Sequence, residues 1–249
     1  MSVTVAKAFG IVEALAAETD RGLTLGDLSV RVAMPKSTVH RYLATLLELG
    51  LALRSDTDRF RLGTKVIELA GAYLANNDLR KESESIMDEL SSQTNETVHL
   101  AVRSGSEVVY VAKVESKHAL RMYSYIGARL PMYSTALGKS MLAFGPEEWL
   151  QETLTRGLKR RTPHTIVSPS ALKAELAGIR DRGFSLDNEE NEVDVRCVGA
   201  PVFDFSRTVV AAISVSGPID RMNERRSAEL GPVVRKAADR ISRRVGYPG

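Results

Sequence analysis

The sequence predicts an α+β protein with two domains, and three observations lead to that class. The chain has 249 residues, which is long for one domain and comfortable for two. Within the first 62 residues, three short helical patterns are followed by one strand-turn-strand pattern. Beyond residue 78, pairs of alternating strands are separated by grouped helices, which favours a largely antiparallel sheet.

The composition is that of an ordinary globular protein, with 43% hydrophobic and 26% charged residues. No apolar run approaches the roughly 18 residues of a membrane span, and the start, MSVTVAKAFG, lacks the pattern of a signal peptide. The single cysteine, Cys197, excludes an internal disulfide and fits a reducing compartment. We therefore expect a cytoplasmic protein that does not contact a membrane.

The first two helices are predicted over residues 4–18 and from Thr24 to about Val32. Apolar residues of the first recur at helical spacing until the pair Gly22-Leu23 interrupts them. Thr24 is a favourable N-cap, and Asp27 at the third helical position completes a capping box. Leu23 and Leu28 flank this box as a hydrophobic staple, so the entry of the second helix is well specified.

A third helix is predicted to begin near Pro35, because proline in the first turn loses no hydrogen bond. Its apolar residues share one face at 3.6-residue spacing, and they are Val39, Leu43, Leu46 and Leu47. The opposite face carries Ser37, Arg41, Ala44 and Glu48. Gly50 ends the helix.

A small hairpin is predicted next, because residues 51–54 and 59–62 alternate around the polar turn 55–58. Leu51 and Leu53 alternate with Ala52 and Arg54, so we expect the arginines of the hairpin to face outward. A helix from Thr64 to about Ala75 follows, and Asn76-Asn77-Asp78 marks a boundary. The predicted domains are residues 1–63, a linker helix at 64–77, and residues 78–249.

This order of helices and hairpin is that of a winged helix-turn-helix, whose third helix enters the major groove of DNA. Residues 31–65 carry seven basic residues against three acidic ones, while the whole chain has a net charge of only +3. The polar residues that start the third helix or lie on the hairpin are the candidate DNA contacts, namely Lys36, Ser37, Thr38, His40, Arg41, Tyr42, Arg54 and Arg59. The alternative is a small helical module that binds protein.

The elements predicted after residue 78 mix strands and helices. The expected strands are 97–103, 107–114, 119–126, 195–203 and 208–216, with a turn at Ser104-Gly105-Ser106. The expected helices are 79–92, 136–156, 169–182 and 222–245. The last of these is basic, and we expect its charges to be solvated rather than to contact DNA.

Several motifs resemble one known family. PKSTVHRYLATLLELG and RFRLG resemble the DNA-binding half of IclR-type transcriptional regulators, and ETVHLAVRSGSEVVYVAKVES, GARLPMYSTALGKSMLAF, DNEENEVDVRCVGAPVFD and AAISVSGPI resemble their effector-binding half. The resemblance covers nearly the whole chain. One departure is Ala33-Met34, where a Gly-Leu pair is common, and it predicts a looser turn.

The resemblance implies a cytoplasmic bacterial repressor or activator with a GAF-like C-terminal domain that binds a small metabolite, often an organic acid. It implies a homodimer or homotetramer on a palindromic operator in double-stranded DNA, with RNA polymerase as a further candidate partner. No cofactor is expected.

Candidate effector contacts begin at the helix predicted from Ala136. The free amides of Ala136 and Leu137 suit a carboxylate, although an ordinary helix start with water on its amides is the alternative. By resemblance, Asp187 and Cys197 face the effector. Because Asp187 would repel a carboxylate, we expect it to accept a hydrogen bond from a hydroxyl or hydrated carbonyl.

Two serines and three apolar residues complete the candidate site. Ser214 and Ser216 share one side of the last strand and could add hydroxyls, or could bond local backbone instead. By resemblance, Met122, Leu130 and Val195 form an apolar wall, although core packing would also explain them.

Three other readings compete with a DNA-binding regulator. A cysteine-dependent enzyme is disfavoured because Cys197 lies in an alternating strand without a glycine-rich elbow, and no histidine motif adjoins it. The acidic run DNEENEVD lacks the ligand spacing of a calcium loop, so no metal is expected. A small-molecule sensor acting through protein partners is the remaining reading, and a weak salt dependence of any DNA binding would favour it.

Overall fold

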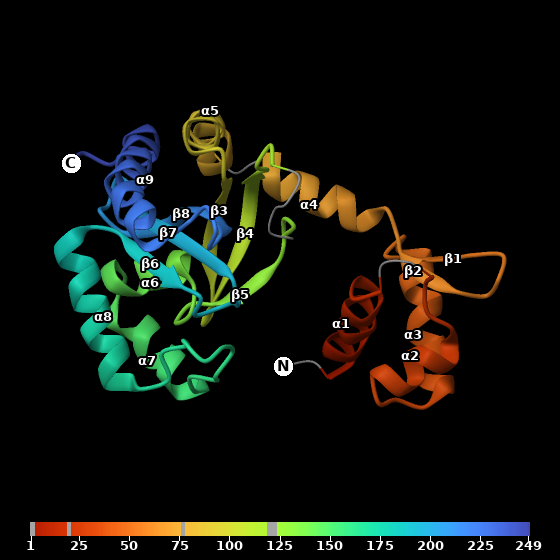
Figure 1. Ribbon diagram of the computed structural model, residues 1–249. Coiled ribbons are helices and arrows are strands. Elements are labelled where there is room, and N and C mark those ends of the chain that lie inside the picture. The colour runs from red at the N-terminus through yellow and green to blue at the C-terminus, as the bar shows by residue number, and fades with distance from the viewer. Residues whose placement is uncertain (1–2, 19–20, 76–77, 119–123) are drawn as a thin grey trace. The chain divides into compact units, whose positions relative to one another are not determined.

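The computed structural model describes residues 3–18, 21–75, 78–118 and 124–249 (Figure 1). The chain divides into two compact units, residues 1–76 and 77–249. Among the described residues, no helix combines the length and hydropathy needed to cross a membrane.

The first unit has the predicted order of elements. They are α1 (Val3–Ala16), α2 (Leu25–Arg31), α3 (Lys36–Glu48), β1 (Ala52–Arg54), β2 (Phe60–Leu62) and α4 (Lys65–Ala75). A single core joins the helices to the hairpin, and its buried members include Ile11, Leu15, Leu28, Val39, Leu43 and Phe60. The unit is therefore a winged helix-turn-helix with the β1–β2 hairpin as its wing.

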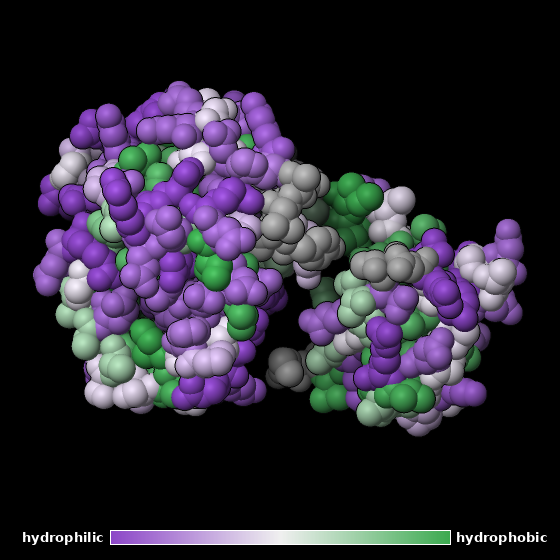
Figure 2. Space-filling model, viewed as in Figure 1, coloured by the Kyte–Doolittle hydropathy of each residue, from purple (hydrophilic) through white to green (hydrophobic). Residues whose placement is uncertain are grey.

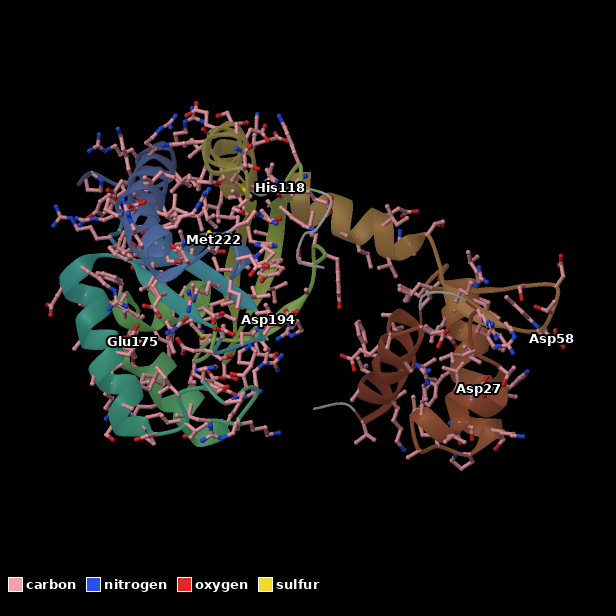
Figure 3. The ribbon with its side chains drawn as sticks, in the orientation of Figure 1. Asp27, Asp58, His118, Glu175, Asp194 and Met222 are labelled. Carbon is pink, nitrogen blue, oxygen red and sulfur yellow. The ribbon has the colours of Figure 1, made fainter. Side chains whose placement is uncertain are left out.

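The capping box of α2 is confirmed. The Thr24 hydroxyl accepts a hydrogen bond from the Asp27 N–H at 3.1 Å, and the Asp27 carboxylate accepts one from the Thr24 N–H at 2.9 Å. Leu23 and Leu28, the expected staple, are both buried. Figure 3 labels Asp27 at the start of α2 and Asp58 in the turn of the wing.

The start of α3 differs by one position from the prediction. Pro35 is the N-cap rather than a residue of the first turn, because its ψ of 143° is extended. The Pro35 carbonyl accepts from the N–H groups of Thr38 and Val39 at 2.9 and 3.0 Å and so starts the helix. No side chain caps this end.

The alternation expected in the first strand of the wing is wrong. Ala52 is fully buried, whereas Leu53 is 50% exposed. Ala52 pairs with Leu62 and Arg54 pairs with Phe60, so Arg54 lies on the same face of the hairpin as Ala52. The small alanine is needed there because α3 and α1 already fill the core beneath the wing.

The second unit is built on a six-stranded antiparallel sheet with the strand order β5-β4-β3-β8-β7-β6. Its strands are β3 (Thr97–Ser104), β4 (Glu107–Val114), β5 (Arg129–Pro131), β6 (Ser185–Asn188), β7 (Val195–Phe203) and β8 (Val209–Pro218). This sheet confirms the predicted α+β class.

Helices cover both faces of this sheet. The helices α5 (Asp78–Thr94) and α9 (Glu224–Arg244) pack on an apolar face, where Val98, Leu100 and Val215 are fully buried. On the other face lie α6 (Ala136–Phe144) and α8 (Pro169–Arg182), with α7 (Glu147–Arg156) packed beyond (Figure 1). The surface of this unit is mainly hydrophilic in the view of Figure 2.

Three expectations for the second unit need correction. Residues 119–123 lie outside the described residues, and 124–126 are not a strand, since the third strand is Arg129–Pro131. The helix expected over 136–156 is two helices, because Pro146 begins α7 as its N-cap. The short strand β6 was not predicted, because its sequence SLDN has little strand propensity.

The turn between α2 and α3 is strained rather than loose. Ala33 has a φ of +50°, in the left-handed region where a side chain costs free energy and glycine does not. The Ala33 N–H nevertheless donates to the Val30 carbonyl at 3.2 Å, so the turn retains its hydrogen bond. Alanine at this position therefore lowers stability while the turn keeps its hydrogen bond.

We expect Ala33→Gly to stabilise the first unit by about 0.5–1 kcal/mol, because relief of the left-handed strain exceeds the added freedom of the unfolded chain. Urea unfolding followed by circular dichroism measures the change. Ala44→Gly, at an exposed position inside α3, is the matched control and should destabilise by about 1 kcal/mol. A urea midpoint of A33G at or below that of the wild type would contradict the inferred backbone strain at Ala33.

Candidate functional site

The outer surface of α3 presents most of the predicted DNA contacts. Lys36, Ser37, His40 and Arg41 are exposed, and Thr38 and Tyr42 are half-buried beside them. The guanidinium carbon of Arg41 lies 5.7 Å from the centre of the Tyr42 ring. The polar residues therefore gather at the beginning of the helix, as a helix that meets base edges requires.

The two wing arginines have different environments. Arg54 is exposed and pairs with Asp58 at 2.7 Å. Arg59 is half-buried, and its Nη1 donates to the Gly22 carbonyl at 2.8 Å, which ties the wing to the turn before α2. Arg54 is thus the freer of the two to exchange its partner for a phosphate.

A cavity of about 190 Å³ lies in the second unit, between the sheet and the start of α6. A cavity of this size suits a small metabolite, since an apolar cavity of about 150 Å³ binds a molecule as large as benzene. The cavity brings together the predicted effector contacts Leu130, Ala136, Leu137, Asp187, Val195, Cys197, Ser214 and Ser216. Met122 lies outside the described residues.

The cavity also has walls that sequence reasoning missed. They include Tyr110, Ser124, Tyr125, Thr135, Asn191 and Glu192. His99 lies directly behind them, with its Nε2 2.8 Å from the Ser124 hydroxyl and its ring stacked on Tyr110 at 4.4 Å between centres. A signal for His99 was present, since Thr97 and His99 alternate with the apolar Val98 and Leu100.

The floor of the cavity is a row of polar residues across neighbouring strands. Asp187 pairs with Cys197, and Cys197 pairs with Ser216. In the next row, Ser214 lies between Gly199 and His99. Because side chains alternate between the faces of a sheet, all of these lie on the face that α6 covers.

The start of α6 forms the opposite wall. The Thr135 hydroxyl caps the helix by accepting from the Gly138 N–H at 3.1 Å, and it donates to the Pro131 carbonyl at 2.8 Å. The N–H groups of Ala136 and Leu137, in the first turn, have no acceptor within the helix. They line the cavity and provide the positive end of the helix dipole.

Glycine at two positions allows this approach. A Cβ on Gly199 would lie 2.8 Å from the Ala136 carbonyl carbon, and one on Gly138 would lie 2.2 Å from the Met132 Cα. A larger residue at either position would push the start of α6 away from the sheet or from the preceding turn. The absence of these side chains therefore sets the depth of the cavity.

Asp187 is the main charged group of the floor, and it is 3% exposed. Its Oδ1 accepts from the N–H groups of Glu190 and Asn191 at 2.8 and 3.3 Å. Burial raises its pKa to about 7, with repulsion from Glu190 adding to the rise and Lys139 opposing it. Near neutral pH the carboxyl group can therefore either accept or donate a hydrogen bond.

The neighbouring serine and histidine side chains of the floor are neutral. Ser214 is 1% exposed, and its hydroxyl has no hydrogen-bond partner among the described residues. Burial lowers the pKa of His99 to about 3, so its imidazole is uncharged. The Ser216 hydroxyl lies 3.5 Å from the His99 Nδ1. The unpartnered serine hydroxyl is the kind of group that a polar ligand would satisfy.

Cys197 lacks the environment of a nucleophile. Burial and the neighbouring Asp187 raise the pKa of its thiol well above the ordinary value, whereas a reactive cysteine needs a lowered pKa. No cluster of three or more histidine, cysteine, aspartate or glutamate side chains in the described part of the chain has a geometry suited to a metal ion.

Two family models together match most of the chain. The IclR helix-turn-helix domain matches residues 4–56, and the bacterial transcriptional regulator IclR C-terminal domain matches residues 71–243. The chain is 41% identical over 247 residues to the HTH-type transcriptional regulator KdgR of Escherichia coli, covering 98% of this chain and 93% of KdgR.

Solved structures agree with these matches. The crystal structure of Thermotoga maritima IclR is 38% identical, with a TM-score of 0.79 over 98% of this chain and 99% of that one. An IclR homologue from Microbacterium hydrocarbonoxydans, crystallised with 4-hydroxybenzoate, is 26% identical, with a TM-score of 0.82 over 97% of this chain and 98% of that one.

The raised pKa of Asp187 predicts a pH dependence of stability. The folded carboxyl group keeps its proton up to about pH 7, whereas the unfolded one loses it near 3.8. The contribution to the free energy of unfolding is therefore fully present below about pH 4 and is lost as pH rises towards 7, by up to about 4 kcal/mol. Asp187→Asn should flatten this decline in chemical unfolding measured from pH 4 to 8.

Asp204→Asn is the control for this experiment, because the Ser206 hydroxyl lowers the pKa of Asp204 and its contribution is lost as pH falls instead. An unfolding profile of D187N with the same slope as the wild type between pH 4 and 7 would contradict the buried carboxylic acid.

Proposed function

The chain belongs to the IclR family of bacterial transcriptional regulators, and we propose that a small hydroxylated organic acid, bound between α6 and the sheet, controls how α3 binds its operator. The family is one of DNA-binding regulators with a C-terminal ligand-binding domain. The proposal concerns the class of effector, the residues that contact it and the form of the operator. The observation that supports this proposal is the cavity, in which free helix amides face polar groups that lack a partner among the described residues.

The chemistry of the walls supports an acid with at least one hydroxyl or hydrated carbonyl. The amides of Ala136 and Leu137 would bind the carboxylate, since a helix N-terminus favours negative charge. Asp187 and the Ser214 hydroxyl lie across the cavity and would bind the hydroxyl. Leu130 and Val195 would cover the carbon skeleton. The 4-hydroxybenzoate of the Microbacterium complex has this combination of groups.

The DNA contacts would come from the start of α3 and from the wing. Lys36 and Arg41 would reach guanine edges or phosphates, with Ser37, Thr38, His40 and Tyr42 beside them. Arg54 would reach a phosphate or minor groove from the wing, and Arg59 would chiefly hold the wing in place. The wing and helix together would cover one half-site.

A homodimer or homotetramer on a palindromic operator follows from the same proposal. Exposed apolar side chains on α1 and α4 support self-association, among them Phe9 at 60% and Ile67 at 73% exposure. Hydrophobic side chains are visible at the surface over α4 in Figure 2. Association would cover them.

The proposed control is a shift in population between two arrangements of the regulator. An effector that favours one arrangement changes operator affinity, with coupling free energies typically about 1–3 kcal/mol. The coupling must be reciprocal, so operator DNA must change the effector affinity by the same factor. No catalytic step is part of this proposal, and the protonated thiol of Cys197 supports that reading.

The first experiment measures binding of the purified protein to its own upstream intergenic DNA, by fluorescence anisotropy, with and without a panel of small organic acids. Two salt concentrations are used, because log affinity for DNA falls by about 0.9 per phosphate neutralised for each unit of log salt. Selective, salt-sensitive binding that one acid alters supports the proposal. Binding that is indifferent to salt would favour a sensor that acts through protein partners.

Arg41→Ala should lower operator affinity by about 10- to 100-fold, because a good bidentate contact to a base contributes about 1–3 kcal/mol. Arg225→Ala is the matched control, since Arg225 is an exposed arginine of α9 paired with Glu229 at 2.8 Å. Anisotropy titrations of both variants on operator and scrambled DNA measure the effect. Equal operator affinities for R41A and R225A would remove Arg41 from the interface.

Ser214→Ala should weaken binding of the active acid by about 3- to 10-fold, since a neutral hydrogen bond contributes about 0.5–1.5 kcal/mol. Operator affinity without the acid should stay unchanged. Ser170→Ala, at an exposed position early in α8, is the control. Isothermal titration calorimetry provides the affinities, and an S214A value equal to that of S170A would exclude the Ser214 hydroxyl from the contact.

A further inference from the structure

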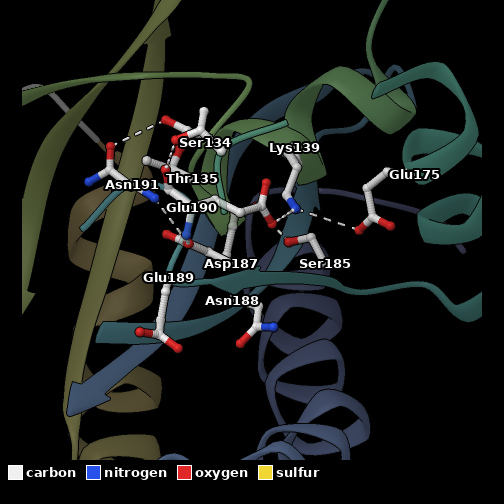
Figure 4. A network of polar contacts seen from close by, with 12 residues as sticks. Ser134, Thr135, Lys139, Glu175, Ser185, Asp187, Asn188, Glu189, Glu190 and Asn191 are labelled. Atoms are coloured by element: carbon white, nitrogen blue, oxygen red, sulfur yellow. Dashed lines mark hydrogen bonds and ion pairs between the residues drawn. The ribbon is translucent and has the colours of Figure 1, made fainter. Parts of the chain in front are cut away.

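A buried lysine lies directly beneath the cavity. The side chain of Lys139, one turn into α6, is 1% exposed. A lysine is almost never fully buried without a partner. Its Nζ forms an ion pair with Glu190 and lies 3.6 Å from Glu175 of α8, as the dashed lines of Figure 4 show. The Lys139 ammonium group therefore links α6, the helix that would bind an anion, to Glu190 and to Glu175 of α8.

Glu190 belongs to the segment 189–194, which joins β6 to β7 and provides part of the cavity wall through Asn191 and Glu192. The segment begins and ends in strained backbone, with φ of 60° at Glu189 and 62° at Asp194. Such conformations persist only where surrounding contacts hold them.

Several of these contacts come from residues next to the cavity. Asp187 accepts two backbone hydrogen bonds from the segment, and the Ser134 hydroxyl bonds the Asn191 side chain at 3.2 Å (Figure 4). From the α7–α8 connection, the Thr165 hydroxyl donates to the Glu190 carbonyl at 2.7 Å. Cationic side chains also contact the segment. Arg161 donates to the Asn191 carbonyl at 3.2 Å, Arg196 lies 3.8 Å from the Glu189 carboxylate, and Lys139, the buried one, pairs with Glu190 from the side of α6.

Lys139 and Glu190 also act on Asp187 with opposite signs. The cation favours the Asp187 carboxylate, and the Glu190 carboxylate opposes it. Other titratable groups act here too: Glu175 raises the pKa of Glu190, and Glu192, Tyr110 and Cys197 lie beside Asp187. The second oxygen of Glu190 has no hydrogen-bond partner among the described residues. Lys139 is thus the charged partner of Glu190, and Glu175 lies near the same ammonium group.

We propose that Lys139 and Glu190 form a positioning pair, which holds the segment 189–194 as the wall of the effector cavity and sets whether Asp187 meets the effector as a charged acceptor or a neutral donor. The inference rests on the proposed effector site, but neither residue is assigned a contact with the effector. It adds a specificity determinant, because a neutral Asp187 tolerates a nearby carboxylate and a charged one selects for a hydroxyl.

The test follows the Asp187 carboxyl group by 13C NMR in the full-length protein without effector. Aspartate is labelled selectively with 13C, and the signal of Asp187 is identified by its loss in D187N. The pH titration is compared for the wild type, Glu190→Gln, Lys139→Met and the conservative Lys139→Arg. Amide hydrogen exchange at Glu190 and Asn191 is measured on the same proteins.

The expected shifts have opposite signs. E190Q removes a neighbouring negative charge and should lower the Asp187 pKa by about 1 pH unit or more, whereas K139M should raise it and K139R should restore it. The two carboxyl groups titrate as a coupled pair, so the comparison uses the apparent midpoints. Amide exchange at Glu190 and Asn191 should accelerate in K139M and recover in K139R.

If the pair only fills space, E190Q and K139M should not shift the Asp187 midpoint in opposite directions. Asp187 midpoints that move in the same direction, or do not move, therefore overturn the proposal. If K139M fails to fold, the nearly isosteric E190Q still decides, since an unchanged Asp187 midpoint in that variant contradicts it. Glu175→Gln is the control, because Glu175 lies farther from Lys139 and is not among the groups acting on Asp187. None of these measurements uses an effector, so their failure is distinct from failure of the effector site.

Discussion

The close approach of α6 to β7 is the constraint on which the second unit depends. At Gly199 the strand comes so near the Ala136 carbonyl that only a hydrogen fits between them. The Ser185 hydroxyl of β6 also bonds that carbonyl and so holds the two elements at this distance. Because the helix starts at this point, its free amides open into the space above Asp187 and Ser214. The contact between Gly199 and the Ala136 carbonyl thus determines where the cavity lies and what shape it has.

The two faces of the sheet differ in how many polar side chains they bury. The face under α5 and α9 carries valine, leucine, isoleucine and alanine, which gain free energy by burial. The face under α6 also buries His99, Asp187 and Ser214, and the Ser214 hydroxyl loses hydration without a hydrogen bond from the described residues in return. A fold selected only for stability would place apolar side chains there. The apolar face compensates for the polar one, and the polar face remains ready to hydrogen-bond a ligand.

Local signals in the sequence were sufficient for much of this protein. The capping box at Thr24 and Asp27 and the helical period of α3 depend on residues a few positions apart, and both were predictable. The helix break at Gly145-Pro146 was equally local, but the long apolar pattern on both sides of it concealed it. The predicted contacts at Ala136 and Ser214 came from a helix start and a strand alternation, whereas Asp187 and Cys197 came from resemblance, since nothing local marks them. The Lys139–Glu190 pair joins residues 51 positions apart and needed the structure. The same holds for β6, which is a strand because β7 pairs with it.

The helices α2, α6 and α3 differ in how the N–H groups at their N-termini are satisfied. The start of α2 is closed by a reciprocal capping box, which satisfies the N–H groups of Thr24 and Asp27 within the protein and fixes the entry of the helix. Thr135 satisfies one amide of α6 and leaves the first two facing the cavity. At α3 the N-cap is Pro35, which provides no side-chain acceptor. The amides of Lys36 and Ser37 are therefore left for an external acceptor, and a DNA phosphate is the anion that a helix in a major groove would meet. A capping threonine at position 35 would satisfy one of these amides internally, and that hydrogen bond would compete with the phosphate.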